Sequence, residues 1–230
     1  MLESRDDRVA NAVVAAVPGA VPTDAAPTNA VPRSTERVAG PTSETRRAVV
    51  LATIELIDRM SYPSVTIDAV ARVSGISKST IYRHWSSRQA LVLEAYAYKT
   101  NGLTAVADTG NAIEDLRTYL GKLAYCLTFG GAASTISGLI VDAVNDPEFA
   151  VHYRATLLRE RRRTFLQILS KGQRRGQIRH DVDLTTAVDA MHGAVHYRLL
   201  VSGQPIDEDF VNGLTDIVTR GLATAHAEPK

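Results

Sequence analysis

The sequence predicts an all-α protein with a small helical head near the N-terminus and a larger helical body after it. From residue 42 onward apolar residues recur at helical spacing, capping residues stand before most of these stripes, and no segment alternates as a half-buried β-strand does. We expect an arm at 1–41, the head at 42–87 and the body at 88–226.

Composition limits the class of protein. Of the 230 residues, 45% are hydrophobic and 22% are charged, which is typical of a globular domain. The formal net charge of +1 excludes a uniformly basic surface, so binding to a polyanion requires locally placed Lys and Arg. Cys126 is the sole cysteine, which excludes an intrachain disulfide. We expect a cytoplasmic protein without a signal peptide, a membrane span or a cofactor.

The first forty residues differ from the rest of the chain. Ala, Val, Pro and Thr dominate residues 9–32, and no large apolar residue is present in that stretch that could anchor a fold. We therefore predict a disordered arm. Arg33 and Arg37 at its end could reach a phosphate backbone, although a solvated tail is the simpler interpretation.

Three short helices are predicted in the head. Thr42-Ser43-Glu44 provides the cap of the first helix, which ends at Ser61-Tyr62-Pro63. Thr66 caps a second helix over 67–73, and Ser74-Gly75 ends it with the left-handed turn that glycine accepts most easily. Ser77 caps a third helix over 78–84, whose one inward apolar residue is Ile81.

Two short helices joined by a tight glycine turn, the second nearly all polar, indicate a helix-turn-helix. Lys78, Ser79 and Thr80 lie at the N-terminal end of the second helix, the part that reads base edges in the major groove, whereas the residues after them would bind phosphates. A structural hairpin with a solvated polar face is the alternative. The predicted DNA contacts are Arg46, Thr66, Ser77, Lys78, Ser79, Thr80, Tyr82, Arg83, His84 and Arg88.

The run TIDAVARVSGISKSTIYRHWSSRQALVLEAY, residues 66–96, resembles the DNA-binding domain of TetR-type transcriptional repressors. The resemblance rests on Ala71, the turn glycine Gly75, and the aromatic-x-His-aromatic pattern of Tyr82, His84 and Trp85. It covers about residues 43–100.

The resemblance implies that Tyr82 and His84 bind phosphates. The chain departs from the family pattern at Trp85, where Phe is usual, and at Arg88, where the family has Lys. For the rest of the chain the resemblance implies an all-helical ligand-binding and dimerisation domain.

The body is predicted to hold six helices, and its last two are rich in small and medium apolar residues. Such a pair packing on its symmetry mate gives a four-helix interface, so we expect a homodimer, which also suits the two half-sites of a palindromic operator. The predicted helices cover 88–106, 116–129, 134–145, 148–171 (opened by Pro147), 183–201 and 207–225.

These features favour a DNA-binding transcriptional regulator, a repressor released from a palindromic operator by a small apolar ligand, and not an enzyme. The sequence does not separate a repressor from an activator. Candidate pocket residues, each also compatible with plain core packing, are Tyr125, Phe129, Ile140, Phe165, Met191 and Tyr197.

A helical enzyme or ligand-binding protein with a DNA-binding head is the alternative function. It would use Asp189, His192 and His196, which share one helix face and could bind a metal, although the HExxH pattern is absent. The basic run at 159–163 is interpreted as a solvated face and not as a second DNA site. Cys126 lies in an apolar stripe, so we expect a buried, unreactive thiol.

Overall fold

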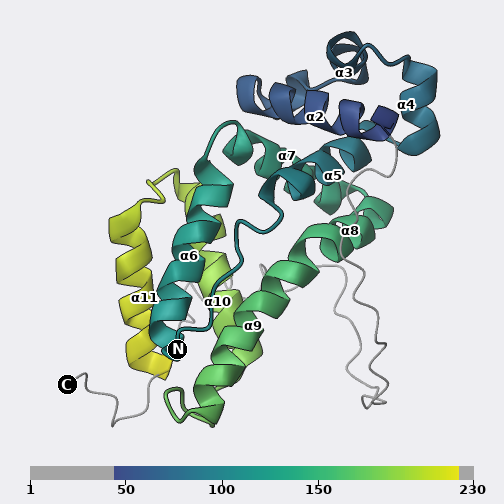
Figure 1. Ribbon diagram of the computed structural model, residues 1–230. Coiled ribbons are helices and arrows are strands. Elements are labelled where there is room, and N and C mark those ends of the chain that lie inside the picture. Colours follow the sequence, from purple (N-terminus) through teal and green to yellow (C-terminus); the bar gives the residue numbers. More distant parts are fainter. Residues whose placement is uncertain (1–43, 223–230) are drawn as a thin grey trace, which may run out of the picture. The chain divides into compact units, whose positions relative to one another are not determined.

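The computed structural model describes residues 44–222, and within this range every regular element is a helix (Figure 1). The all-α class is therefore confirmed. The predicted arm at 1–41, the cap at 42–43 and the end of the last predicted helix lie outside the described residues.

The head consists of α2 (Glu44–Arg59), the short 3-10 turn η1 (Tyr62–Ser64), α3 (Ile67–Ser74) and α4 (Lys78–His84). The predicted caps form: Thr66 accepts the Ala69 amide at 3.1 Å and Ser77 accepts the Thr80 amide at 3.3 Å. Gly75 ends α3 in the left-handed region, with φ of 71°. Ile81 is fully buried, so one side chain anchors the otherwise polar α4.

The body contains seven α-helices in the described range. Two stretches of π-helix extend them, one between α8 and α9 (Arg154–Leu158) and one after α10 (Arg198–Ser202). The helices are α5 (Arg88–Thr100), α6 (Ala112–Thr128), α7 (Ala132–Asn145), α8 (Pro147–Tyr153), α9 (Arg159–Arg174), α10 (Leu184–Tyr197) and α11 (Glu208–Leu222).

Several predicted boundaries in the body are wrong. The helix expected over 116–129 begins at Ala112. The helix expected over 88–106 ends at Thr100, because Asn101 is extended and Gly102 adopts a φ of 79°. The predicted long helix from Pro147 is unbroken along the chain but includes the π-helical turn and extends to Arg174.

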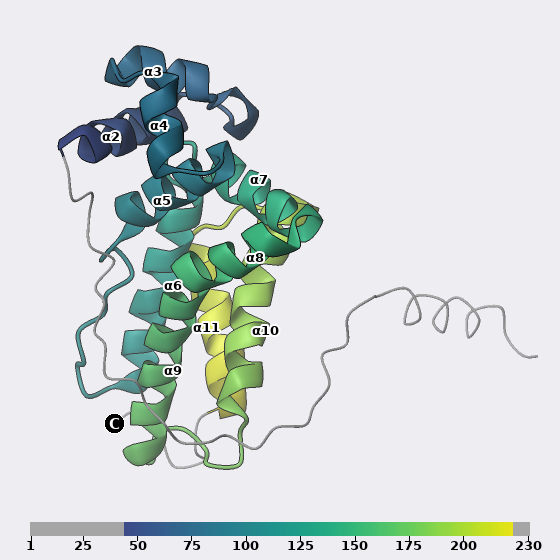
Figure 2. The same cartoon turned by 90° about the vertical axis from the view of Figure 1, so that its right-hand side faces the viewer.

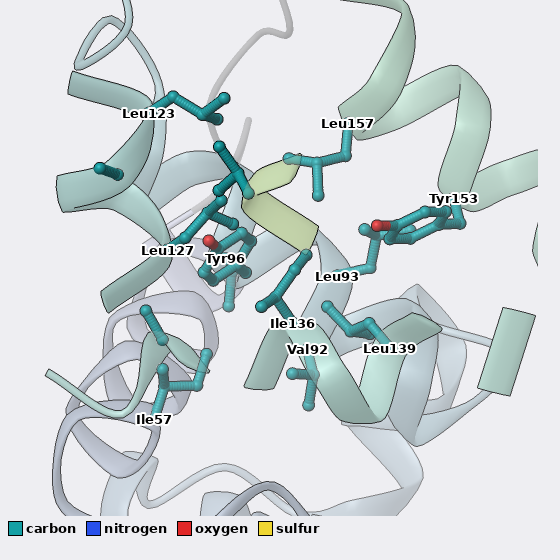
Figure 3. Close-up of a cluster of buried hydrophobic side chains, with 14 of the residues drawn as sticks. Ile57, Val92, Leu93, Tyr96, Leu123, Leu127, Ile136, Leu139, Tyr153 and Leu157 are labelled. Carbon is teal, nitrogen blue, oxygen red and sulfur yellow. The ribbon is translucent and has the colours of Figure 1, made fainter. Parts of the chain in front are cut away.

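The arrangement of helices is clear in two views. α6, α9, α10 and α11 run side by side, and α5 and α7 lie between them and the head (Figures 1 and 2). α5 packs against α2, so the first helix of the body also supports the head. Apolar side chains from α5, α6, α7 and the π-helical stretch Arg154–Leu158 meet in one core, which includes Tyr96 (Figure 3).

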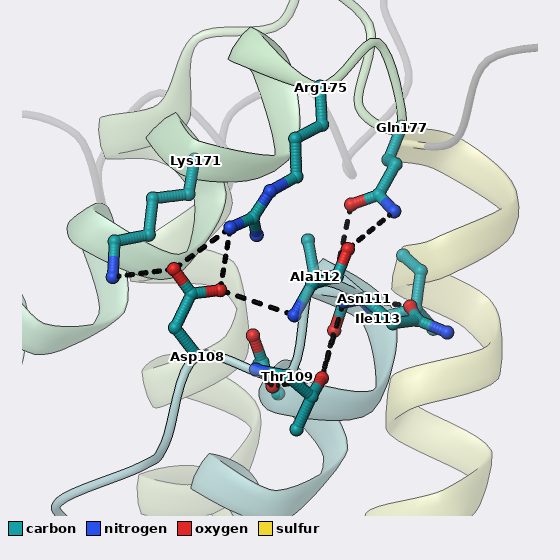
Figure 4. Close-up of polar contacts among 10 residues, drawn as sticks. Asp108, Thr109, Asn111, Ala112, Ile113, Lys171, Arg175 and Gln177 are labelled. Carbon is teal, nitrogen blue, oxygen red and sulfur yellow. Dashed lines mark hydrogen bonds and ion pairs between the residues drawn. The ribbon is translucent and has the colours of Figure 1, made fainter.

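The connection between α5 and α6 is held against the far end of α9 (Figure 4). Asp108 accepts from Lys171 and Arg175 at 3.1 and 2.8 Å, and the hydrogen bond from Arg175 lowers the pKa of this carboxyl. Gln177 bonds the start of α6 through the Ala112 amide, at 3.1 Å. These contacts hold the start of α6 in place, although the connection between α5 and α6 contains no helix.

No single helix in the described range is long and apolar enough to cross a bilayer. α6 and α7 satisfy the length and hydropathy criteria only as a pair bent by 85°.

Candidate nucleic-acid interface

The outer face of α4 is polar and exposed. Lys78, Ser79, Tyr82, Arg83 and His84 are exposed, and Tyr82 has 54% of its surface accessible. The inner face is closed by Ile81 and by Trp85 directly after the helix. The structure thus brings the predicted base-reading and phosphate-binding residues onto one accessible surface.

Several predicted contacts already have partners on this surface, among them the Ser79 and Thr80 hydroxyls, which each lie 3.0 Å from the Ser77 hydroxyl. Lys78 forms an ion pair with Asp68 in the first turn of α3, and this hydrogen bond raises the pKa of the ammonium group. Arg83 donates to the Thr80 hydroxyl at 3.0 Å. Both pairs are solvent-exposed, so their side chains are free to exchange these partners for a phosphate.

Thr66 and Ser77 act locally as helix caps. Each side-chain oxygen accepts a backbone amide from the first turn of its helix. Their first role is therefore to hold α3 and α4 in place, and a phosphate would be a second partner for the same hydroxyl.

Arg46 lies against the head with 32% of its side chain exposed. Its guanidinium forms a bidentate pair with Glu94 of α5, at 3.0 and 2.5 Å, and lies 5.2 Å from the Trp85 ring centre. The Trp85 indole N–H donates to the same carboxylate at 2.9 Å. The indole that replaces the usual Phe thus supplies a hydrogen bond, and the cluster ties α2, α4 and α5 together.

Arg88 occupies a joint between head and body. Its guanidinium lies 4.2 Å from the centre of the Tyr62 ring, donates to the Tyr62 carbonyl at 3.1 Å and reaches Asp142 of α7 at 3.5 Å. The Tyr62 hydroxyl donates to Asp142 at 2.5 Å. Burial raises the pKa of Tyr62 well above its usual value, so its hydroxyl stays a neutral donor.

The ring of Tyr62 lies directly on the backbone of α7. A Cβ placed on Gly138 would overlap this ring, and the Tyr62 amide donates to Ser134 at 2.9 Å. The loop before α7 is equally close to the head, because a Cβ on Gly131 would overlap the Ile57 carbonyl. Two glycines therefore allow the body to touch the head at backbone distance.

Arg47 and Arg72 are not among the DNA contacts predicted from the sequence, although both are exposed on the head, on α2 and α3. The helical spacing of α2 indicates which of its arginines faces outward. Val49 and Val50, three and four residues after Arg46, are buried, so Arg46 lies toward the interior and Arg47 away from it.

The six predicted pocket residues do not share one wall. Tyr125 and Phe129 stack on each other at 4.7 Å but are 49% and 54% exposed, and Tyr197 is 59% exposed. Phe165 and Met191 are fully buried. Ile140 is partly buried against the core. Aromatic residues at the edge of an apolar stripe can face either way, so the sequence pattern does not show which of the six face the interior.

The basic run at 159–163 is not uniformly solvated, which corrects the sequence interpretation. Arg162 and Arg163 pair with Asp189 and Glu160 on the surface, but Arg161 has only 6% of its surface exposed. Its position is explained by spacing, because it stands four residues after Leu157 and four before Phe165, both of which are buried.

The Asp189, His192 and His196 face is not arranged for a metal. Asp189 is occupied by Arg162, and the Nδ1 atoms of both histidines lie within 3.0 Å of backbone carbonyls. Residues 44–222 hold no group of three or more His, Cys, Asp and Glu placed to bind an ion. Cys126 is buried, and burial raises the pKa of its thiol.

Known proteins match both parts of the chain. Residues 49–95 match the family described as "Bacterial regulatory proteins, tetR family", and residues 106–218 match "Tetracyclin repressor-like, C-terminal domain". The DNA-binding transcriptional repressor TetR of Mycobacteroides abscessus is 31% identical over 180 residues, which are 76% of this chain and 92% of that protein.

Solved structures of regulators from this family are similar to the chain as well. The TetR family transcription regulator SCO0332 is 34% identical and has a TM-score of 0.69 over 79% of this chain and 100% of its own. FadR of Bacillus subtilis, solved in complex with stearoyl-CoA, shares the fold at 17% identity and a TM-score of 0.59, over 76% of this chain and 97% of its own. With its helix-turn-helix head and helical body, the chain belongs to the TetR family of transcriptional regulators.

Proposed function

We propose that the protein is a cytoplasmic repressor that binds a palindromic operator as a homodimer and leaves it when a small molecule enters the body. The exposed polar face of α4, held by the buried Ile81, is the observation that carries this proposal. A short helix with one apolar anchor gains nothing in stability from such a face, but the face suits the major groove.

Within this proposal the residues divide by role. Lys78, Ser79 and Thr80 read bases, while Tyr82, Arg83 and His84 bind phosphates. Thr66 and Ser77 contact the backbone with the hydroxyls that cap their helices. We assign Arg46 and Arg88 to holding α4 and the head–body joint, because their guanidinium groups bind Glu94, Tyr62 and Asp142. Arg47 and Arg72 add phosphate contacts.

The dimer would form through α10, α11 and the π-helical turn between them. This surface exposes large apolar side chains that a monomer leaves in water, and a symmetric four-helix packing would cover them. The exposed apolar residues are Tyr197, Leu200, Val201 and Ile217.

A ligand would act through the contacts that join body and head. Tyr62 is hydrogen-bonded to Ser134 and Asp142 and packs on the backbone of α7. A shift of α7 or α5 must therefore move η1 and the helices attached to it. Such a shift in each protomer changes the distance between the two α4 helices and thus the fit to two half-sites. The coupling is reciprocal, so operator DNA weakens ligand binding by the same factor.

The test is a fluorescence anisotropy titration against DNA from upstream of the protein's own gene, at two salt concentrations. The wild type should bind tightly and with strong salt dependence, and Tyr82→Ala should lose at least about tenfold in affinity. Tyr125→Ala removes another exposed tyrosine, on α6, and should bind like the wild type. Binding no tighter than to random DNA, or equal losses in both variants, would refute the proposed interface.

A further inference from the structure

A positive charge is buried in the body without a matching negative one. Arg161 on α9 is 6% exposed, and its Nη2 atom has no hydrogen-bond partner. Its neighbours Arg162 and Arg163 pair with carboxylates, whereas Arg161 forms no such pair within residues 44–222. An unpaired buried charge is costly, so its presence calls for an explanation, and a bound anion that supplies the counter-charge is one.

The groups around Arg161 are polar and come from several helices. Its guanidinium carbon lies 5.7 Å from the ring centre of Tyr96 on α5, and the Tyr119 hydroxyl of α6 donates to the Arg161 carbonyl at 3.0 Å. His192 of α10 meets the Tyr119 and Phe165 rings edge-on, at 6.3 and 5.4 Å. Tyrosine hydroxyls and an imidazole are the donors and acceptors that orient a small polar group.

Arg161 supplies the positive charge of this cluster by itself. The Nδ1 atom of His192 lies 3.0 Å from the Val188 carbonyl and that of His196 lies 2.7 Å from the His192 carbonyl, so Nδ1 carries the proton in each ring. Burial lowers the pKa of His192 to about 4 and also lowers the pKa of His196, which keeps both rings neutral near pH 7. One cation balances one negative charge, which favours a carboxylate over a doubly charged phosphate.

Apolar side chains adjoin the polar cluster. Tyr96 lies among Leu123, Leu127 and Leu157, as Figure 3 shows. The π-helical turn of residues 154–158 immediately precedes α9, and such turns occur often at functional sites. The surroundings therefore suit a molecule with one acidic end and an apolar remainder.

We propose that Arg161 anchors the carboxylate of a small organic acid, which binds between α5, α6, α9 and α10 and is the effector of the repressor. The role of this acid as an effector rests on the proposed function, whereas the binding site itself does not. Tyr96 would transmit the event, because α5 also carries Glu94 and Arg88 to the head. A carboxylate that draws the guanidinium away from the Tyr96 ring changes the packing of that helix.

Calorimetric titration without DNA tests the site directly. The probes are straight-chain carboxylates of two to twelve carbons and benzoate, each paired with its uncharged amide, together with inorganic phosphate. At least one carboxylate should bind the wild type tenfold or more tightly than its amide. Arg161→Gln and Arg161→Met should reduce that preference to less than twofold, and Arg163→Met, which removes an exposed arginine two residues away, should keep it.

Thermal melting without ligand provides the second readout. Because the buried charge lacks a counter-ion, Arg161→Met should melt at the same temperature as the wild type or higher, and the best carboxylate should raise the melting temperature of the wild type alone. A wild type that prefers no carboxylate, a preference for phosphate, a preference that survives in both Arg161 variants, or a clear loss of melting temperature in Arg161→Met would each overturn the proposal. If the carboxylate binds through Arg161 but leaves operator binding unchanged, the site stands and the proposed ligand response fails.

Discussion

At the scale of single residues, the ion pair of Lys78 with Asp68 sets the charge that α4 presents to DNA. Asp68 both occupies the lysine and places a negative charge where phosphates would lie. We therefore expect Asp68→Asn to bind DNA roughly two- to fivefold more tightly at low salt. Asp181→Asn, which removes the same charge from an exposed pair with Arg179 in the body, is the control. Anisotropy titrations check this, and equal affinities for the wild type and Asp68→Asn would contradict it.

His192 gives the protein a pH-dependent stability. Its pKa of about 4 in the folded state lies below the value of ~6.5 expected in the unfolded chain. Between these values the unfolded chain binds a proton that the folded protein does not, so the free energy of unfolding falls as the pH falls from ~6.5 to ~4. The loss attributable to this residue is at most roughly 3 kcal/mol.

Urea unfolding at several pH values measures this effect. His192→Gln should lose less stability than the wild type between pH 6.5 and 4, while His180→Gln, which removes an exposed imidazole, should follow the wild type. Identical slopes for the wild type and His192→Gln would show that the ring is not buried in its neutral form.

At the scale of elements, the contact between η1 and α7 depends on the absence of a side chain at Gly138. Gly138→Ala should displace the Tyr62 ring from the backbone of α7 and lower the free energy of unfolding by about 1–3 kcal/mol. Gly121→Ala on α6 has open space around its new methyl group and should stabilise the helix by about 0.5–1 kcal/mol. Chemical denaturation distinguishes the two, and a stabilising Gly138→Ala would mean that head and body are not seated as described.

Local chemistry explains which elements the sequence could predict. Thr66 and Ser77 each accept a first-turn amide as expected, because a cap involves residues three apart, and Ser87 caps α5 in the same way. The pairing of Arg46 with Glu94 joins residues 48 positions apart and leaves no local signal. The inward position of Arg161 was visible in the four-residue spacing of α9, but its charge favoured the surface interpretation.

At the scale of the whole molecule, the proposed dimer surface gives a direct prediction. Ile217 on α11 is 73% exposed, and in the dimer it would be covered. Ile217→Glu should therefore yield a monomer in analytical ultracentrifugation at micromolar concentration and weaken operator binding. Val144→Glu, at a 78% exposed position on α7, should remain dimeric. If Ile217→Glu sediments as the wild type does, the interface lies elsewhere.

In the proposed complex, two copies of α4 read two half-sites of one operator. The most direct measurement is the affinity of the wild type for a footprinted operator and for the same duplex with one half-site scrambled, together with the protein-to-DNA ratio by native mass spectrometry. We expect two protomers on the intact operator and an affinity at least about 100-fold weaker for the scrambled duplex. Equal affinity for the two duplexes, or one protomer on the intact operator, would contradict it.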